Sequence, residues 1–224
     1  MNELKINYDL LMIKDMWGNA RFFGGNQEWY TTRLQRLAGC GATTGSCIVM
    51  YEMRKHGCGV YSVKDFRQLM NEMWGFITPG QRGVDSVEMF ATGFERYMSE
   101  NAISHDDRKS LEVPQCKHKR PPKAVVFAFL KDALQNDTPI AFLNLGCGME
   151  TRLDSWHWVT ITGAKYISNL DMLTVEIADE GVLKKIDLGL WLETTNMGGG
   201  FVYYNNMAIK VSETTENNND ARAG

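Results

Sequence analysis

The sequence predicts an α+β protein whose helices precede an antiparallel sheet. Helical patterns with recognisable ends occur between residues 40 and 136, and strand-like segments separated by Gly, Asn and Asp turns follow them. Helices grouped before strands favour a sheet that packs on helices. The length of 224 residues and the hydrophobic content of 44% allow a sizeable core. We therefore expect one domain over residues 1–211 and a disordered polar tail over 212–224.

The helices are recognised from their ends as well as from their apolar positions. The helix that begins at Cys40 finishes with three basic residues before Gly57, which suits a C-terminus. Ser62 is a favourable N-cap for the next helix, and prolines open the last one. We expect helices over residues 40–56, 62–74, 84–102 and 121–136.

Runs of β-branched and aromatic residues predict the strands. The first 35 residues have no regular pattern, and their glycine- and aromatic-rich stretch at 22–30 indicates a loop. Beyond residue 137, apolar runs of strand length are bounded by turn residues. We expect strands over residues 139–145, 157–167, 173–181 and 200–211.

Charge and hydropathy argue against several kinds of partner. The 24 basic and 27 acidic residues give a net charge of −3, which offers no electrostatic case for nucleic acid or an anionic membrane. The short basic run at 117–123 is typical of a solvated loop. The chain contains no secretory signal and no apolar run of about 18 residues. We therefore expect a cytoplasmic protein without a membrane segment.

Cysteine usage indicates free thiols. The five cysteines are an odd number without paired spacing, which is typical of a reducing compartment rather than of a disulfide framework. Cys116 and His118 offer two metal ligands, but a closed zinc site needs four, and no second pair has a suitable spacing. We therefore expect no metal site.

Cys40 occupies a position that suits a reactive thiol. It opens a helix whose first two turns, "CGATTGS", hold only small residues, so another element can pack closely against them. A thiol there faces the positive end of the helix dipole and free backbone N–H groups, which favour the nucleophilic thiolate. The same N–H groups can hold an oxyanion. Cysteine is also among the most often buried residues, so Cys40 taken alone is more simply a core residue.

His157 and Asp179 are predicted to lie beside each other at one end of the sheet. Strand alternation places them on the apolar faces of successive strands, with His157 opening the first strand and Asp179 closing the second. A carboxylate on an apolar face is costly unless it is paired. If the strands are antiparallel neighbours, the carboxylate reaches the imidazole and fixes its tautomer. Taken singly, the histidine is a satisfied core or surface residue and the aspartate a turn residue.

The order of these residues resembles that of papain-like cysteine peptidases, and most closely that of the C39-like bacterial peptidases. That family has a Cys-Gly at a helix start, a strand before the catalytic histidine, a His-aromatic-Val strand and an aspartate one strand later. The matching segments run from about Gln27 to Gly181 and include "GCGATTGSCIVMY", "AVVFAFLKDALQNDTPIAFLNL", "HWVTITGA" and "VEIADEG". The resemblance implies a papain-like fold, with an N-terminal helical lobe packed on a C-terminal antiparallel sheet.

The resemblance also implies roles for individual residues. Cys40 would be the nucleophile, His157 the general base and acid, and Asp179 the orienting acid. The family's oxyanion-hole glutamine has two candidates. Gln35 lies five residues before the cysteine in the charged "RLQRL", whereas Gln27 lies thirteen before it, beside glycines and aromatic residues that suit a pocket wall. We favour Gln27.

Two positions depart from the family's pattern. Gly39 stands where the family often has Asp, and Glu180 stands where it commonly has Pro. Neither change removes a catalytic group.

The function that the resemblance implies is hydrolysis of a peptide or protein substrate by a cysteine peptidase or amidohydrolase. The reaction would pass through an acyl-enzyme and need no metal or organic cofactor. Acyl transfer on the same triad is an alternative, because only the acceptor differs. The pattern also fits a papain-like module that binds a peptide or protein without turnover, and it allows a redox role through Cys40 and Cys47. Cys47 is more simply a core residue.

Overall fold

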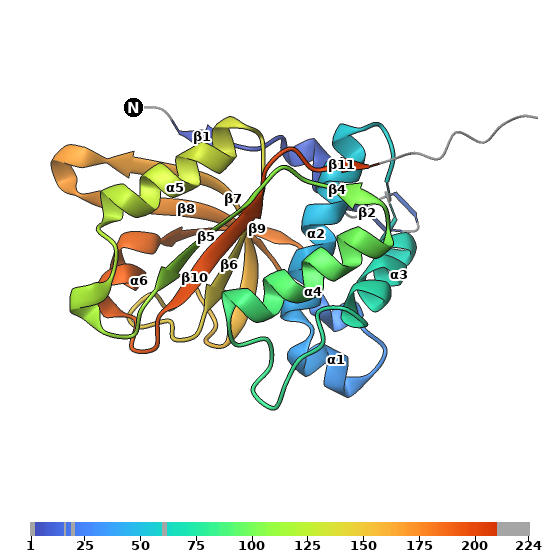
Figure 1. Ribbon diagram of the computed structural model, residues 1–224, viewed down its shortest axis with the longest axis horizontal. Helices are drawn as coiled ribbons and strands as arrows, with labels where there is room; N and C mark the ends of the chain where they lie inside the picture. The colour runs from blue at the N-terminus through green and yellow to red at the C-terminus, as the bar shows by residue number, and fades with distance from the viewer. Residues whose placement is uncertain (1–2, 16, 19–20, 60–61, 210–224) are drawn as a thin grey trace, which may run out of the picture.

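The computed structural model describes residues 3–15, 17–18, 21–59 and 62–209. The tail predicted at 212–224 lies outside the described residues, so its disorder stays a prediction. The described residues form a central antiparallel sheet with helices on both faces (Figure 1). One hydrophobic core cluster draws residues from the sheet and from all the longer helices.

Four of the described α-helices correspond to the predicted ones, with small shifts at their ends. The predicted helix at 84–102 begins only at Val87, because Ser86 caps it through the Met89 backbone N–H. Ser62 caps its helix as predicted, accepting from the Asp65 N–H. The bounds are α1 (Arg33–Ala38), α2 (Cys40–Lys55), α3 (Val63–Trp74), α4 (Val87–Glu100), α5 (Lys123–Gln135) and α6 (Leu188–Thr194).

The main sheet has the strand order β5-β10-β6-β7-β8-β9, and each neighbouring pair is antiparallel. β1 pairs with β7 at Gly163 and Ala164, just beyond Ile161, where the pairing of β7 with the start of β6 stops. Two small pairs, β2 with β3 and β4 with β11, lie outside the sheet. The bounds are β1 (Leu4–Lys5), β2 (Met12–Lys14), β3 (Arg21–Phe23), β4 (Ile103–Ser104), β5 (Arg108–Val113), β6 (Ile140–Asn144), β7 (His157–Ile167), β8 (Met172–Asp179), β9 (Val182–Asp187), β10 (Gly199–Tyr204) and β11 (Ala208–Ile209).

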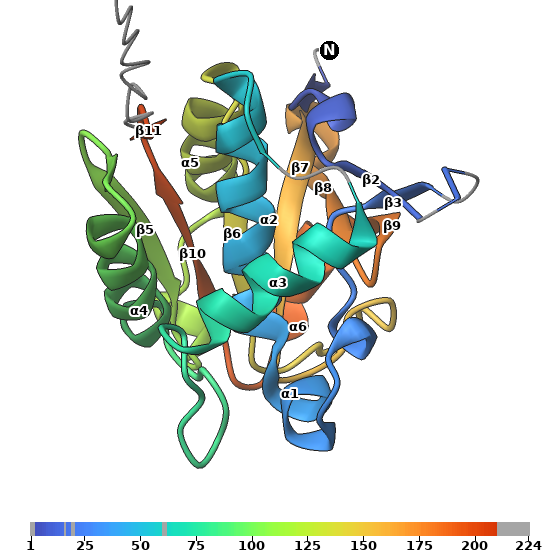
Figure 2. The ribbon, with the colours of Figure 1, turned by 90° about the vertical axis from the view of Figure 1, so that its right-hand side faces the viewer.

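The two faces of the sheet are covered by different helices. Tyr204 of β10 packs on Phe94 of α4, whereas the preceding Tyr203 packs on Phe129 of α5. On the α5 side, Phe142 of β6 meets Trp191 of α6 with ring centroids 4.8 Å apart. α2 lies along β6 and β7, and α3 crosses its outer side (Figure 2). The sheet therefore lies between α2 and α4 on one face and α5 and α6 on the other.

Several elements are absent from the sequence prediction. β5 lies between α4 and α5, and α6 lies between β9 and β10, so helices and strands are less segregated than the sequence patterns indicate. β5 and β9 are edge strands, whose charged residues weaken the apolar alternation. α6 is only one to two turns long. The strand predicted at 200–211 ends at Tyr204, and a left-handed Asn206 separates it from β11.

Close packing explains the small residues at the start of α2. A Cβ atom at Gly45 would lie 2.8 Å from Ile77 Cδ1, and one at Gly41 would lie 3.3 Å from Val84 Cγ2. Both contacting side chains belong to the segment that joins α3 to α4. The segment between α3 and α4 can therefore pack closely against the outer side of α2, while Cys40 at the start of the helix faces the sheet.

Candidate active site

Four candidate residues meet at one end of the sheet. Cys40 is the first residue of α2, His157 is the first of β7 and Asp179 is the last of β8. Gln27 opens the 3₁₀ turn η2 (Gln27–Trp29). All four line one cavity of about 20 Å³, which has room for about one water molecule.

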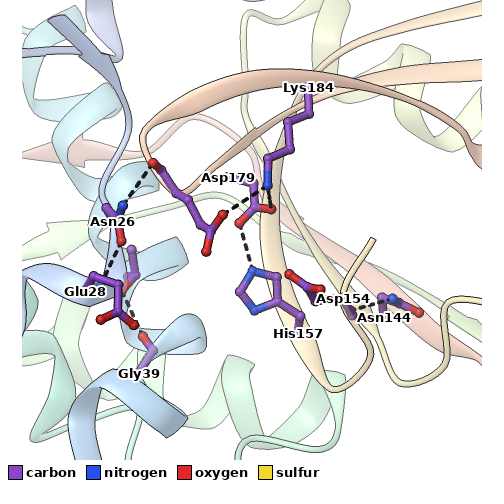
Figure 3. Close-up of polar contacts among 10 residues, drawn as sticks. Asn26, Glu28, Gly39, Asn144, Asp154, His157, Asp179 and Lys184 are labelled. Carbon is purple, nitrogen blue, oxygen red and sulfur yellow. Dashed lines mark hydrogen bonds and ion pairs between the residues drawn. The ribbon is translucent and has the colours of Figure 1, made fainter. Parts of the chain in front are cut away.

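The strand register brings His157 to Asp179. Thr160 pairs with Ala178 in the antiparallel β7–β8 ladder, so the start of β7 lies beside the end of β8. His157 Nε2 and Asp179 Oδ1 are 2.8 Å apart (Figure 3). The other carboxylate oxygen, Oδ2, accepts from Lys184 Nζ at 2.8 Å. Both oxygens of this buried carboxylate are therefore partnered.

The surroundings of the pair favour charge on both groups. Burial by itself would raise the pKa of Asp179, but hydrogen bonds and charges from His157 and Lys184 hold that pKa below its usual value. Burial lowers the pKa of His157, but hydrogen bonds to Asp179 and Cys40 outweigh it, and the pKa rises to about 10. Since Nε2 is engaged by Asp179, Nδ1 is the ring nitrogen left for Cys40.

Cys40 lies at a helix start without a side-chain cap. Its N-cap is Gly39, which offers no side chain to the N–H groups of the first turn, so these groups remain free to bind an anion. Cys40 is 8% exposed. A Cβ atom at Gly39 would lie 2.4 Å from the Tyr30 ring and from the Gln35 carbonyl oxygen. This crowding explains why the chain has glycine where the resembled family often has aspartate.

The two glutamine candidates have different surroundings. Gln35 accepts from Thr32 Oγ1 and donates to Asn71 Oδ1 on α3, at 2.8 and 3.1 Å, so its amide joins α1 to α3. Gln27 lines the cavity with Cys40. Its buried Oε1 has no hydrogen-bond partner among the described residues.

The segment that carries Gln27 is fixed on both sides. The Gly25 N–H donates to Cys47 Sγ at 3.2 Å. Asn26 Nδ2 donates to the Glu180 carbonyl oxygen at 3.1 Å, at the tip of the β8–β9 hairpin (Figure 3). Gln27 is thereby held between α2 and the end of β8 that bears Asp179.

The β8–β9 hairpin explains the second departure from the family's pattern. Glu180 and Gly181 form its two-residue turn, with φ values of +52° and +79°. A turn with two positive φ values matches the twist of an antiparallel hairpin. Proline, whose φ is fixed near −65°, cannot occupy either position.

Cys47 has surroundings unlike those of Cys40. Burial raises the pKa of the Cys47 thiol to about 11, although the Gly25 N–H opposes the shift. The two cysteines are seven residues apart on one helix, which corresponds to a rise of about 10.5 Å. That separation exceeds the Cα distance that a disulfide spans. All five cysteines are free, and this geometry argues against a Cys40–Cys47 redox pair.

Lys184 is a site residue that the sequence reasoning missed. It belongs to β9, and its Nζ also lies 3.2 Å from Glu180 Oε2. The sequence does contain a signal for this contact. A two-residue turn after Asp179 pairs Asp179 with Val182, and this register places Lys184 diagonally across from Asp179 on the neighbouring strand. Recognising β9 as a strand was the missing step.

Within the described ranges, no group of three or more His, Cys, Asp and Glu side chains is arranged to hold a metal ion. In the same part of the chain, no helix is both long and apolar enough to cross a membrane.

Comparison with known proteins gives a structural likeness only. No family model matches the chain, and no curated protein does. The fold is similar to a crystal structure of UfSP from C. elegans, with a TM-score of 0.50 and 9% sequence identity. The likeness covers 91% of this chain and 34% of UfSP, so the chain spans about a third of that protein's length. It confirms the papain-like α+β fold predicted from the sequence.

Proposed function

We propose that this chain is a cysteine peptidase or amidohydrolase that cleaves a peptide or protein through Cys40, His157 and Asp179. The observation that carries the proposal is that the imidazole of His157 binds Asp179 and lines the same small cavity as Cys40. His157 Nε2 is 2.8 Å from Asp179 Oδ1, and interaction with Cys40 contributes to the raised pKa of His157. A thiol, an imidazole and a carboxylate in that order are the arrangement that generates a thiolate nucleophile.

The proposed reaction starts from a Cys40 thiolate and a His157 imidazolium. The thiolate attacks the scissile carbonyl carbon, and the oxyanion is held by the N–H groups at the start of α2 and by the Gln27 amide. Collapse of the resulting tetrahedral intermediate breaks the C–N bond, and the leaving amine takes the proton of the His157 imidazolium. Water then attacks the thioester, with the neutral imidazole as base, and releases the acid. Asp179 keeps the imidazole in the required orientation throughout.

Two further observations support this assignment. UfSP, a structural neighbour, is a papain-like cysteine protease, which favours peptidase chemistry on this fold. The order of motifs favours a C39-like bacterial enzyme, and the odd number of unpaired cysteines favours a reducing compartment such as the cytoplasm; both are finer parts of the proposal. At 9% identity, neither substrate nor partner carries over from UfSP.

A papain-like module that binds a partner without turnover is the second candidate. The observation that favours it is the narrowness of the cavity at the triad, about 20 Å³. Trapping of an acyl-enzyme distinguishes the peptidase from the binding module. A peptidase forms an acyl-enzyme adduct on Cys40 when it is mixed with activated peptide esters and quenched in acid, whereas a binding module forms none.

Alkylation by iodoacetamide tests the thiolate directly. We expect Cys40 in the wild type to react at pH 6 about 100-fold faster than an ordinary exposed thiol, because few ordinary thiols are ionised at that pH. Peptide-resolved mass spectrometry would give a rate for each cysteine. His157→Ala should remove the advantage of Cys40.

His118→Ala is the matched control, because this histidine lies in the separate 3₁₀ turn Lys117–Lys119. It should leave the alkylation rate of Cys40 unchanged. A Cys40 that reacts slowly in the wild type, or that is indifferent to His157→Ala, would contradict the proposed function.

A further inference from the structure

Lys184 binds the carboxylate of Asp179 through the oxygen that His157 does not use. Its Nζ lies 2.8 Å from Asp179 Oδ2, whereas His157 Nε2 lies 2.8 Å from Oδ1 (Figure 3). The side chain of Asp179 is 4% exposed and that of Lys184 is 27% exposed. A buried carboxylate therefore has a nitrogen on each oxygen, and one of the two belongs to a lysine that the proposed reaction does not use.

The β8–β9 hairpin fixes this lysine in place. Asp179 pairs with Val182, so Lys184 stands diagonally across from Asp179 on the neighbouring strand. Its Nζ also lies 3.2 Å from Glu180 Oε2. Alternation along β9 directs the next side chain, Lys185, to the opposite face of the strand, where it is 54% exposed. Of these two adjacent lysines, Lys184 is the one that reaches the carboxylate.

The ammonium group of Lys184 acts on the imidazole through this carboxylate. Each nitrogen is 2.8 Å from its own oxygen, so the two nitrogens are closer together than a Debye length, which is about 8 Å at physiological salt. Two cations at such a distance in a largely buried site repel each other. Asp179 favours a proton on His157, and the charge of Lys184 opposes it.

Other titratable groups near the pair lie on α2, η2, β3 and the hairpin tip. Burial raises the pKa values of Cys47 and Tyr30, so both groups are neutral at pH 7. Glu180 opposes Lys184, but its side chain is 46% exposed and solvent screens it. The others are Cys40 of α2, Glu28 of η2, whose side chain is 63% exposed, and the exposed Arg21 of β3. Because Lys184 contacts a buried carboxylate, its charge is screened less than these exposed charges.

The charge of Lys184 matters most after an acyl-enzyme has formed. Before acylation, Asp179 and Cys40 together raise the pKa of His157 to about 10. Acylation removes the thiolate, so Asp179 and Lys184 are left as opposing charges beside the ring. Hydrolysis of the thioester then needs a neutral imidazole as base. Each pH unit by which the pKa of His157 exceeds the working pH makes this neutral form about tenfold rarer.

We propose that Lys184 is a positioning residue that acts through Asp179 and keeps His157 able to release its proton when the acyl-enzyme is hydrolysed. This inference rests on the proposed function and assigns its second step a residue outside the triad. In that step the imidazole takes a proton from water, the new C–O bond forms and the C–S bond breaks. The products are the acid, the Cys40 thiolate and the His157 imidazolium, so the starting pair is regenerated.

Histidine ¹⁵N NMR in the Cys40→Ala background tests the inference. This variant has no thiolate, so its triad carries the charges of the acyl-enzyme. The chain has four histidines, and the resonance that is absent from the His157→Ala spectrum identifies His157. Adding Lys184→Met should raise the pKa of His157 by about 1 pH unit. Lys184→Arg should restore the value, because it keeps the positive charge.

The direction of the shift separates a charge effect from a structural one. If Lys184 only held the hairpin in shape, its replacement would loosen the contact between Asp179 and His157. The pKa of His157 would then fall toward its ordinary value of about 6.5. Lys185→Met is the matched control, because it removes the adjacent lysine charge from the opposite face of β9. It should leave the pKa of His157 unchanged.

The lifetime of the acyl-enzyme gives a second readout. The wild type and Lys184→Met are mixed with the same activated peptide ester, the excess ester is removed, and the adduct on Cys40 is followed by mass spectrometry. At pH 7 the adduct on Lys184→Met should decay about tenfold more slowly, because fewer imidazoles are neutral. The adduct on Lys184→Arg should decay at the wild-type rate.

Iodoacetamide labelling separates failure of this inference from failure of the proposed function. An unchanged or lowered pKa of His157 in Lys184→Met would overturn the role of Lys184. Equal decay of the adducts would overturn it as well. If wild-type Cys40 is nevertheless labelled fast and in a His157-dependent way, the proposed function stands. Slow labelling of wild-type Cys40 would overturn both, because Lys184 would have no reaction to act in.

Discussion

The two cysteines of α2 are seven residues apart, are both buried and line the same small cavity, but they face different groups. Cys40 faces an imidazole at a helix start, whereas Cys47 faces the backbone N–H of Gly25 inside the core. Both thiols are buried. Burial therefore does not decide what a thiol can do. Under the proposed function the group opposite the thiol decides, and one helix presents two such surroundings two turns apart.

The largest expected effect is the difference in labelling rate between the thiols of Cys40 and Cys47. With a pKa of about 11, only about one Cys47 in ten thousand is ionised at pH 7. We expect iodoacetamide to label Cys47 at least about 1,000-fold more slowly than Cys40 in the folded protein. Labelling in concentrated urea should bring the two rates within a few-fold. Similar labelling rates of Cys40 and Cys47 in the folded state would contradict the inference that their different surroundings set their reactivity.

Crowding around the start of α2 is tested by Gly39→Asp. Asp is a better N-cap than glycine by a few tenths of a kcal/mol, but its Cβ would lie 2.4 Å from the Tyr30 ring. Overpacking of this kind costs about 1–3 kcal/mol. We expect a net loss of about 2 kcal/mol in the free energy of unfolding, measured by urea titration.

The control for that variant is Gly75→Ala. Gly75 has a φ of −67°, and an added Cβ would meet only the Glu72 carbonyl oxygen at 3.3 Å. The free energy of unfolding should change by less than about 0.5 kcal/mol. Gly39→Asp with wild-type stability would mean that Tyr30 moves aside freely.

The structural role of Cys47 is tested by Cys47→Ala. The variant leaves the buried Gly25 N–H without its acceptor, which costs about 1–3 kcal/mol. Urea titration should detect this loss. Cys116→Ala, at an exposed position, should change the unfolding free energy by less than about 0.5 kcal/mol. Equal effects at the two positions would argue against a structural thiol at Cys47.

The pKa of His157 tests the contact that sets Cys40 apart. Histidine ¹⁵N NMR should show His157 titrating near pH 10, and Cys40→Ala should lower that pKa because one hydrogen-bond partner is lost. A histidine whose folded pKa is raised stabilises the fold below its unfolded pKa of about 6.5. That stabilisation is lost as pH rises through about 10. Titration near pH 6.5 would contradict the arrangement.

The smallest expected effect is that of Lys184→Met. Loss of the lysine charge should raise the pKa of Asp179 toward its ordinary value. A carboxylate with a lowered folded pKa stabilises the fold above its unfolded value of about 4, and this stabilisation is lost as pH falls through the folded pKa. The acid-side loss of stability should therefore be smaller in the variant and should be complete at a higher pH, as measured by urea midpoints from pH 2 to 6.

Lys185→Met is the control for Lys184→Met. The side chain of Lys185 is 54% exposed and lies 3.9 Å from Glu3. Its replacement should therefore leave the loss of stability at acid pH as it is in the wild type. Identical acid limbs in the two variants would mean that Lys184 does not act on Asp179.

The sequence predicted the elements that have strong signals at their ends. α2 and α3 were found because Gly57 and Ser62 mark where one ends and the next begins. β7 and β8 were found because their apolar runs are bounded by turns. β5, β9 and α6 were not, because edge strands carry charges and a short helix has too few residues to establish a period.

For the candidate site, the sequence predicted ends of elements better than contacts between them. Cys40, His157 and Asp179 each begin or end a helix or strand, so the residue order already indicated that they meet. The surroundings of Gln27 depend on two hydrogen bonds made by its neighbours. The Gly25 N–H donates to Cys47 Sγ, and Asn26 Nδ2 donates to the Glu180 carbonyl at the tip of the β8–β9 hairpin. Such contacts join residues far apart in the chain, and local patterns do not encode them.

The bond between Asn26 and the tip of the β8–β9 hairpin has a consequence for the order of assembly. Its two residues are 154 positions apart, and the chain between them supplies both Cys40 and His157. During synthesis, α2 emerges before β7, so for a time Cys40 exists without His157 beside it. Contacts of such long range also form late in folding, because the intervening loop must be closed first. Competence of the site is therefore expected to be among the last properties that the growing chain acquires.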